Sequence, residues 1–129
     1  MSNPIVWIAT EVALAAHAEQ LAEHGGGEGV RDAGALESAM ARPRYLAEYG
    51  DPDITALAAA YAFGIARNHP FVDGNKRTAA VVSETFLILN GHALEASDAE
   101  VVVAFVALAA GELSEAELAD WFRTHLAVG

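Results

Sequence analysis

The amino-acid sequence predicts an all-α protein with six helices, and three observations support this prediction. First, 29 of the 129 residues are alanine, which has the highest helix propensity and loses no side-chain entropy in a helix. Second, apolar segments alternate with short polar or glycine-containing links. Third, capping residues precede most of these segments. No repeat, low-complexity tract or long linker interrupts the pattern, so we expect a single domain over residues 1–129.

The N-terminal part of the chain is expected to hold one helix, with an arm before it and a loop after it. Residues 1–9 include a short apolar run, residues 5–8, and fit either a strand or an anchored arm. Thr10 can cap a helix over residues 11–24. The glycine-rich connector, residues 25–34, ends this helix. It lacks the Gly-Lys-Ser/Thr ending of a P-loop, so we interpret it as a plain loop.

The middle of the chain predicts a short helix and a long apolar one. The short helix covers residues 35–42 and ends at Pro43, because the residue before a proline disfavours the helical region. Residues 44–52 contain two tyrosines and a glycine and are expected to be irregular, as a small hairpin or flap. Asp53 caps the long helix, residues 54–68, which is apolar on nearly all sides and is therefore expected to be central and buried.

Three more helices follow, each with boundary signals. Asn75 starts the first, and Gly91 provides a left-handed cap at its end. Capping boxes of Ser97 with Glu100 and of Ser114 with Glu117 open the other two. The expected ranges are residues 75–90, 98–110 and 115–126.

Composition and charge exclude several classes of function. The formal net charge of −11 argues against broad contact with nucleic-acid phosphates and against docking on an anionic membrane. The chain has no cysteine, which excludes disulfides and Cys-ligated metal sites. The longest uncharged run, residues 54–66, is shorter than the roughly 18 residues that a spanning helix needs. The first ten residues lack the basic start of a signal peptide. We therefore expect a cytoplasmic protein with neither a nucleic-acid nor a membrane partner.

One short segment has the opposite charge from the rest of the chain. Residues 67–77 carry a net charge of +2, which leaves −13 for the remainder. Their basic residues are Arg67, Lys76 and Arg77, and they lie between the two most apolar predicted helices. A loop held by buried helices can build a well-defined anion site, although a run of charges is more often a solvated surface.

The end of this segment has the chemistry to bind a phosphate. Gly74 and Asn75 tolerate the tight backbone that leads into a helix, and the first N–H groups of a helix attract phosphate. Lys76 and Arg77 add positive charge beside them. Two basic residues at a helix start oppose the helix dipole, and such violations of a local rule are typical of functional sites.

Two further residues of the segment could carry chemistry. Asp73 offers oxygen ligands of the kind that hold Mg²⁺ next to a phosphate. His69 could take a proton from a hydroxyl nucleophile. Each has a simpler interpretation, because a histidine at a helix end is more often a cap and an aspartate before glycine usually forms a turn. The uninterrupted run of compatible residues is a stronger signal than any single one.

The segment HPFVDGNKRTA, residues 69–79, resembles the active-site motif of the Fic/Doc family. It is most similar to the Doc (death-on-curing) branch, because Lys76 replaces the glycine that is usual in Fic enzymes and Ala80 stands where they carry a second arginine. Doc-like stretches at residues 86–91 and 111–114 extend the resemblance over nearly the whole chain.

The resemblance implies the small, mostly helical Fic fold and an ATP-dependent transferase. Fic enzymes transfer AMP from ATP to a hydroxyl of a target protein, whereas Doc-type toxins bind ATP in the reversed sense and transfer its γ-phosphate. Their target is elongation factor Tu, and the result is arrested growth. ATP and Mg²⁺ are therefore the expected cofactors. A cognate antitoxin and elongation factor Tu are the expected partners.

The resemblance also implies roles for individual residues. His69 is the expected general base, and Asp73 the expected magnesium ligand that helps to position His69 or the nucleotide. Nucleotide and phosphate binding are expected from Gly74, Asn75, Lys76 and Arg77. Arg67 matches a basic residue of Doc and is expected either to bind phosphate or to pair with an acidic neighbour.

Val81 departs from the Doc pattern, which has asparagine one helical turn after Arg77, so nucleotide affinity or activity is expected to be lower. Glu84 follows on the same helix face and either orients Arg77 or lies on the surface.

The sequence lacks the Ser/Thr-x-x-x-Glu-Gly/Asn helix through which many Fic proteins inhibit themselves. By resemblance, restraint would come from a separate antitoxin.

Three functions remain open from the sequence. The first is a toxin that phosphorylates a translation factor, favoured by Lys76 and Ala80. The second is a Fic-type AMP transferase, which an intact His69, Asp73 and Asn75 would also serve. The third is a catalytically silent antitoxin-binding protein, suggested by Val81 and the acidity of the chain.

Overall fold

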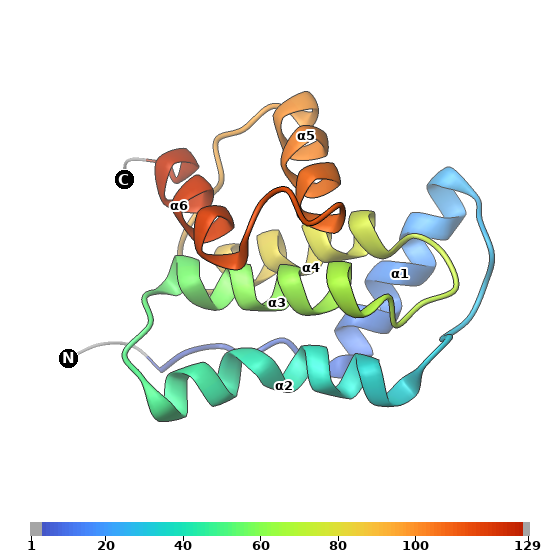
Figure 1. Cartoon of the computed structure of the whole chain (residues 1–129), viewed down its shortest axis with the longest axis horizontal. Coiled ribbons are helices and arrows are strands. Elements are labelled where there is room, and N and C mark those ends of the chain that lie inside the picture. The colour runs from blue at the N-terminus through green and yellow to red at the C-terminus, as the bar shows by residue number, and fades with distance from the viewer. Residues whose placement is uncertain (1–3, 128–129) are drawn as a thin grey trace.

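The computed structural model describes residues 4–127, and these form six helices, as the sequence predicts (Figure 1). The helices are α1 (Thr10–His24), α2 (Ala33–Tyr49), α3 (Ile54–Asn68), α4 (Asn75–Leu89), α5 (Asp98–Ala109) and α6 (Glu115–His125). Within the described residues, β-structure is limited to two isolated bridges, Val30 with Phe71 and Leu94 with Leu126. The expected all-α fold class is therefore confirmed.

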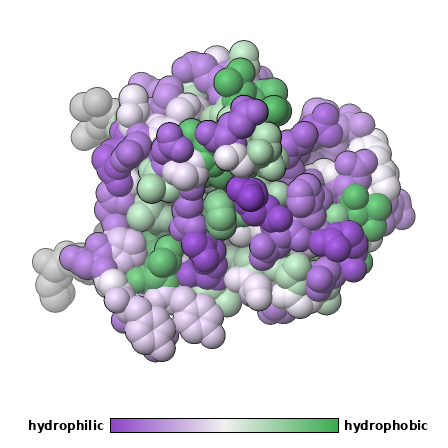
Figure 2. Space-filling model, viewed as in Figure 1, coloured by the Kyte–Doolittle hydropathy of each residue, from purple (hydrophilic) through white to green (hydrophobic). Residues whose placement is uncertain are grey.

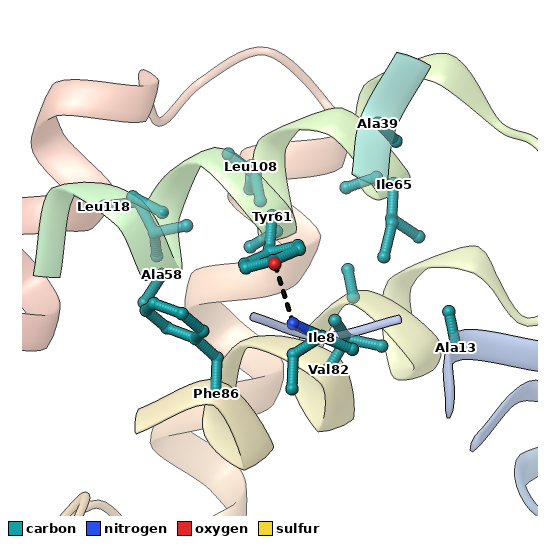
Figure 3. Close-up of a cluster of buried hydrophobic side chains, with 14 of the residues drawn as sticks. Ile8, Ala13, Ala39, Ala58, Tyr61, Ile65, Val82, Phe86, Leu108 and Leu118 are labelled. Carbon is teal, nitrogen blue, oxygen red and sulfur yellow. Dashed lines mark hydrogen bonds between the residues drawn. The ribbon is translucent and has the colours of Figure 1, made fainter. Parts of the chain in front are cut away.

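Helix α3 lies at the centre of the molecule and packs against α2, α4, α5 and α6. Its alanines allow close approach of these neighbours, and Tyr61 and Ile65 fill the space between them with no exposed surface. Figure 3 shows this core, with Phe86 and Val82 of α4 below the α3 side chains. The prediction of a central, buried helix over residues 54–68 is confirmed.

The chain before α1 is an extended arm. Ile8 donates its backbone N–H to the hydroxyl of the buried Tyr61 at 2.9 Å, and the side chain of Asn90 bonds both the N–H and the carbonyl of Val6. Residues 4–9 belong to no strand, so the anchored arm is correct and the strand is wrong. The predicted N-terminal segment also included Met1 to Asn3, which lie outside the described residues.

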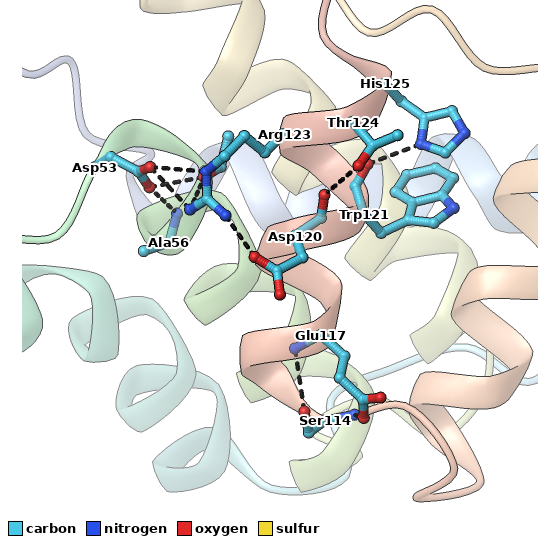
Figure 4. A network of polar contacts seen from close by, with 10 residues as sticks. Asp53, Ala56, Ser114, Glu117, Asp120, Trp121, Arg123, Thr124 and His125 are labelled. Atoms are coloured by element: carbon cyan, nitrogen blue, oxygen red, sulfur yellow. Dashed lines mark hydrogen bonds and ion pairs between the residues drawn. The ribbon is translucent and has the colours of Figure 1, made fainter.

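Most helix starts lie where the sequence places them. Asp53 accepts from the Ala56 N–H at 2.9 Å, and both predicted capping boxes are formed. Figure 4 shows the one at Ser114 and Glu117. Thr10 is not a cap, because it is the first helical residue of α1 and Ala9 precedes it without a side-chain cap.

Helix α2 is longer than predicted, since it continues through Pro43 to Tyr49. Proline has no N–H for the carbonyl of Ala39 and normally interrupts a helix. Here Pro43 extends the buried stripe of Leu36, Ala39 and Met40 at helical spacing, and this face packs on α3. Burial of the stripe offsets the missing hydrogen bond. The expected hairpin or flap is correspondingly wrong, because most of residues 44–52 belong to α2.

The surface of the molecule is mainly polar, with exposed apolar side chains in several places, one of which is α5. Val102, Val103 and Val106 are each about half exposed or more, and Figure 2 shows a hydrophobic patch over this helix. No helix within residues 4–127 is both long enough and apolar enough to cross a lipid bilayer.

Candidate active site

The loop between α3 and α4 carries the predicted motif. Helix α3 ends at Asn68, and His69 follows in the left-handed conformation with φ of 48° and ψ of 56°. Gly74 precedes α4 with φ of 76° and offers no side chain to cap it. The first N–H groups of α4 therefore lack the side-chain acceptor that usually satisfies such groups, and they carry the positive end of the helix dipole. This is the arrangement that binds anions at helix starts.

Asn75 braces the loop from inside. It is 7% exposed, its Oδ1 accepts from the Phe71 N–H and its Nδ2 donates to the Phe71 carbonyl, both at 3.0 Å. Its Nδ2 also lies 3.5 Å from His69 Nδ1, too long to fix the protonation of the ring. The side chain of Asn75 thus shapes the loop, while its backbone N–H lies at the helix start.

Asp73 is held on two sides. Its Oδ1 accepts from the Gly74 N–H at 2.8 Å, and its carbonyl lies 2.9 Å from Nε2 of His17 on α1. His17 is 5% exposed and stacks on Phe71, with ring centroids 3.9 Å apart. Sequence reasoning missed His17, whose only sequence signal is its place among the apolar residues of the first helix.

The glycine-rich connector lies against the motif loop. A Cβ on Gly26 would lie 2.7 Å from Asp73 Oδ2, and one on Gly27 would lie 2.8 Å from the Val72 side chain. Val72 also donates its N–H to the Gly29 carbonyl at 3.1 Å. A Cβ at position 26 or 27 would therefore displace a side chain of the motif loop, and at position 26 the φ of 125° also favours glycine.

A groove of about 860 Å³ opens at this loop. Six of the seven predicted site residues line it: His69, Asp73, Gly74, Asn75, Lys76 and Arg77. Helix α5 contributes an apolar wall of Val101, Val102, Phe105 and Val106, which sequence reasoning did not place at the site. Val81 and Glu84 also line the groove. The groove thus combines Lys76 and Arg77 near the start of α4 with an apolar side on α5. Its lining also includes four carboxylates, those of Glu23, Asp73, Glu84 and Asp98.

Arg67 lies away from this group. Its guanidinium is 5.6 Å from the centre of the Phe63 ring, and a Cβ on Gly111 would lie 3.5 Å from its Nη1. Arg67 is not among the groove residues, and it makes no salt bridge within residues 4–127. Its contacts are with an aromatic ring and a glycine turn.

The described residues contain no group of three or more acidic or histidine side chains that could hold a metal ion by themselves. Asp73 is the only carboxylate among the predicted site residues, and its Oδ2 makes no hydrogen bond within residues 4–127. Mg²⁺ is commonly bound by one or two carboxylates together with substrate phosphates and water. A free carboxylate oxygen beside a helix start without a side-chain cap fits that mode of binding.

Comparison with known proteins identifies the family. The model of the Fic/DOC family matches residues 7–87. The chain belongs to the Fic/DOC family. This Fic/DOC protein is 33% identical over 117 residues to the protein kinase doc of Escherichia phage P1, a match that covers 90% of this chain and 92% of the phage protein. It is also 47% identical over 74 residues to toxin Doc of Mycolicibacterium smegmatis, where the match covers 56% of this chain and 57% of that protein.

Proposed function

We propose that this Fic/DOC protein is the toxin of a toxin–antitoxin pair and a protein kinase. It transfers the γ-phosphate of ATP to a hydroxyl side chain of a translation factor, elongation factor Tu by family resemblance, and so arrests translation and growth in the cytoplasm. The observation that carries the proposal is the groove, in which His69, Asp73 and two cations meet at an uncapped helix start. The names of the two relatives, a toxin and a protein kinase, support it.

In the proposed reaction the target hydroxyl attacks the γ-phosphorus, and the bond from that phosphorus to the β–γ bridging oxygen breaks. ADP leaves with the electron pair of that bond. His69 accepts the hydroxyl proton, since its Nε2 makes no hydrogen bond within residues 4–127. Lys76, Arg77 and the first N–H groups of α4 bind the phosphate oxygens and stabilise their charge.

Asp73 would hold Mg²⁺ through its free carboxylate oxygen, with phosphate oxygens and water as the other ligands. When bound, the ion neutralises phosphate charge as the bond to the leaving group breaks. The connector leaves little space on one side of this carboxylate, because even a Cβ on Gly26 would lie 2.7 Å from Oδ2.

Lys76 is the basis for preferring phosphate transfer over AMP transfer. A glycine at this place would leave the helix start open to a diphosphate, whereas a lysine side chain fills space and adds charge. Ala80 lines the groove without offering a cation. Both features disfavour the AMP-transfer arrangement of usual Fic enzymes.

The test is a paired labelling experiment. The purified protein is incubated with Mg²⁺, elongation factor Tu and ATP labelled at either the γ- or the α-phosphate. We expect label in the factor from γ-labelled ATP only, and loss of about 10²- to 10⁴-fold in rate for His69→Ala, as is usual for removal of a general base. His92→Ala is the matched control, because His92 is exposed and does not line the groove.

Label from the α-phosphate alone would instead identify an AMP transferase. No label from either position, together with growth arrest that survives His69→Ala, would favour the catalytically silent antitoxin-binding protein. Growth arrest that is relieved by co-expression of a small neighbouring antitoxin frame would support the toxin role independently of the chemistry.

A further inference from the structure

Arg31, in the connector before α2, contacts the site without belonging to the motif. Its side chain donates from Nε to the His69 carbonyl at 2.7 Å and from Nη2 to the Asn68 carbonyl at 2.9 Å. Its backbone N–H donates to the Pro70 carbonyl, also at 2.7 Å. One residue thus engages three consecutive carbonyls at the point where α3 ends.

His69 needs such support because of its backbone conformation. It is the only non-glycine residue with positive φ within residues 4–127, and this region is costly for a residue with a Cβ. Pro70 follows it, and a residue before proline is pushed toward the extended region. A strained conformation of this kind persists only where its surroundings enforce it.

Arg31 supplies that enforcement. The last carbonyls of α3 have no partners within the helix and carry the negative end of its dipole, so a guanidinium fork is a favourable cap for them. Both side-chain bonds form only when the carbonyls of Asn68 and His69 point in the same direction. The pair of bonds therefore disfavours an extended His69, and Pro70 disfavours the right-handed alternative, which leaves the left-handed turn.

We propose that Arg31 is a positioning residue for the reaction, which holds His69 in the left-handed conformation that directs its ring to the groove. The inference rests on the proposed role of His69 as the base. Arg31 does not line the groove, so it acts through His69 and makes no contact with the nucleotide. Its backbone contact with Pro70 does not depend on its side chain, so truncation of the side chain leaves the connector in place.

The test compares Arg31→Ala, Arg31→Lys and the control Arg44→Ala, whose guanidinium lies over the Trp7 ring and outside the groove. For Arg31→Ala we expect kcat for phosphate transfer to fall about tenfold, the factor that corresponds to the usual cost of a left-handed residue. The KM for ATP should stay within about twofold, because a group that acts only on the reacting base changes kcat alone. The kcat of Arg31→Lys should lie between those of the wild type and Arg31→Ala. Added guanidinium at a non-denaturing concentration should restore part of the rate of Arg31→Ala.

A second measurement does not depend on activity. The backbone ¹³C chemical shifts of His69 report whether the residue is left-handed, and they should move toward extended values in Arg31→Ala and remain unchanged in Arg44→Ala. If the wild type transfers no phosphate, the proposed function fails, and the shifts still test the positioning. The inference would be overturned if the His69 chemical shifts in Arg31→Ala still indicated the left-handed conformation. An unchanged kcat, with or without a raised KM, would also overturn it. If Arg31→Ala does not fold, the same criteria apply to Arg31→Lys.

Discussion

Asp73 depends on a residue far away in the sequence for its orientation. The Asp73 carbonyl and the Gly74 N–H belong to one planar peptide unit. His17 binds the carbonyl end of this unit, and the Asp73 carboxylate accepts from the N–H end. A carbonyl can only accept, so Nε2 of His17 is the donor. His17 therefore fixes the direction of the N–H that orients the carboxylate.

His17→Phe tests this dependence. Phenylalanine keeps an aromatic ring to stack on Phe71 but has no hydrogen-bond donor. We expect the Mg²⁺ concentration for half-maximal phosphate transfer to rise about two- to tenfold, the range that corresponds to the usual net value of one hydrogen bond. Initial rates measured against Mg²⁺ concentration check the result.

His17→Gln is the matched variant, because its amide Nε2 can donate in place of the imidazole, and it should recover part of the Mg²⁺ dependence. A Mg²⁺ dependence that is identical in all three proteins would show that the carbonyl contact does not orient Asp73.

Lys76→Gly tests whether Lys76 favours transfer of the γ-phosphate over transfer of AMP. We expect γ-phosphate transfer to fall about 10- to 100-fold, as on loss of a charge-assisted hydrogen bond, and transfer from α-labelled ATP to appear. The paired-label assay measures both in one experiment. Loss of γ-transfer without any gain of α-transfer would mean that Lys76 binds phosphate but does not exclude the AMP-transfer arrangement.

That the motif residues lie together could be predicted from sequence because they are consecutive. Six of its predicted members line one groove. Two kinds of information could not be predicted from the sequence. One is the direction of a side chain, as for Arg67, and the other is the set of contacts from distant segments, as for His17 and Arg31. Both depend on how helices pack, which residue spacing in the motif does not determine.

At the scale of elements, the starts of helices were predicted better than their ends. A start is marked by a side chain that bonds a nearby N–H, as Asp53 and Ser97 do, and such contacts are local. The end of α2 was missed because a local rule about proline was overridden by packing. Leu36, Met40 and Pro43 bury one face of α2, so tertiary contacts decided the outcome.

The packing of α2 on α3 relies on Gly64. A Cβ at this position would lie 2.9 Å from Ala39 Cα and 3.3 Å from the Ala39 carbonyl oxygen, the carbonyl to which Pro43 has no N–H to donate. We expect Gly64→Ala to lower the free energy of unfolding by about 1–3 kcal/mol, as overpacking usually does. Urea denaturation followed by circular dichroism measures this change.

Gly34→Ala is the control for Gly64→Ala, since the added Cβ would have its nearest contact at 3.4 Å, with the Asp32 side chain. Helix propensity alone should make this variant slightly more stable. Equal effects at the two positions would contradict a close contact between α2 and α3.

At the scale of the whole molecule, the site is a meeting point of segments that are far apart in the chain. Helix α1 and the connector hold the loop from one side, α3 and α4 carry it, and α5 forms the apolar wall of the groove. Most of the acidic charge lies outside residues 67–77, which are positive. The proposed phosphate site in this acidic protein therefore depends on two of its seven basic residues, Lys76 and Arg77, which lie together at the start of α4.

The acidic carboxylates also determine how the fold responds to pH. Hydrogen bonds from the N–H and hydroxyl of Ser97 lower the pKa of Glu100, to which His125 adds, and Ser114 lowers the pKa of Glu117 in the same way. For Asp53, burial raises the pKa, but bonds from Thr55, Ala56 and Arg123 outweigh it, so the pKa is lowered overall. Figure 4 shows Asp53, Arg123 and Glu117 in this part of the molecule.

A carboxylate whose pKa is lower in the folded state stabilises the fold above its unfolded pKa, and this stability is lost as pH falls toward the folded pKa. The unfolded values are 4.5 for glutamate and 3.8 for aspartate, so the melting temperature should fall as the pH decreases from about 5 to 3. Glutamine at positions 100 and 117 can still complete both capping boxes but does not titrate. Glu100→Gln with Glu117→Gln should therefore give a flatter melting profile over this range.

Loss of negative charge on acidification also relieves repulsion within a chain of net charge −11, which would stabilise the fold as the pH falls. Glu19→Gln with Glu48→Gln separates the two effects, because it makes the same change in net charge at exposed carboxylates that have no hydrogen bonds within residues 4–127. This control should keep the steep dependence of the melting temperature on pH that is expected for the wild type. Equal slopes for the two double variants would mean that the capping boxes contribute nothing to the acid sensitivity of the fold.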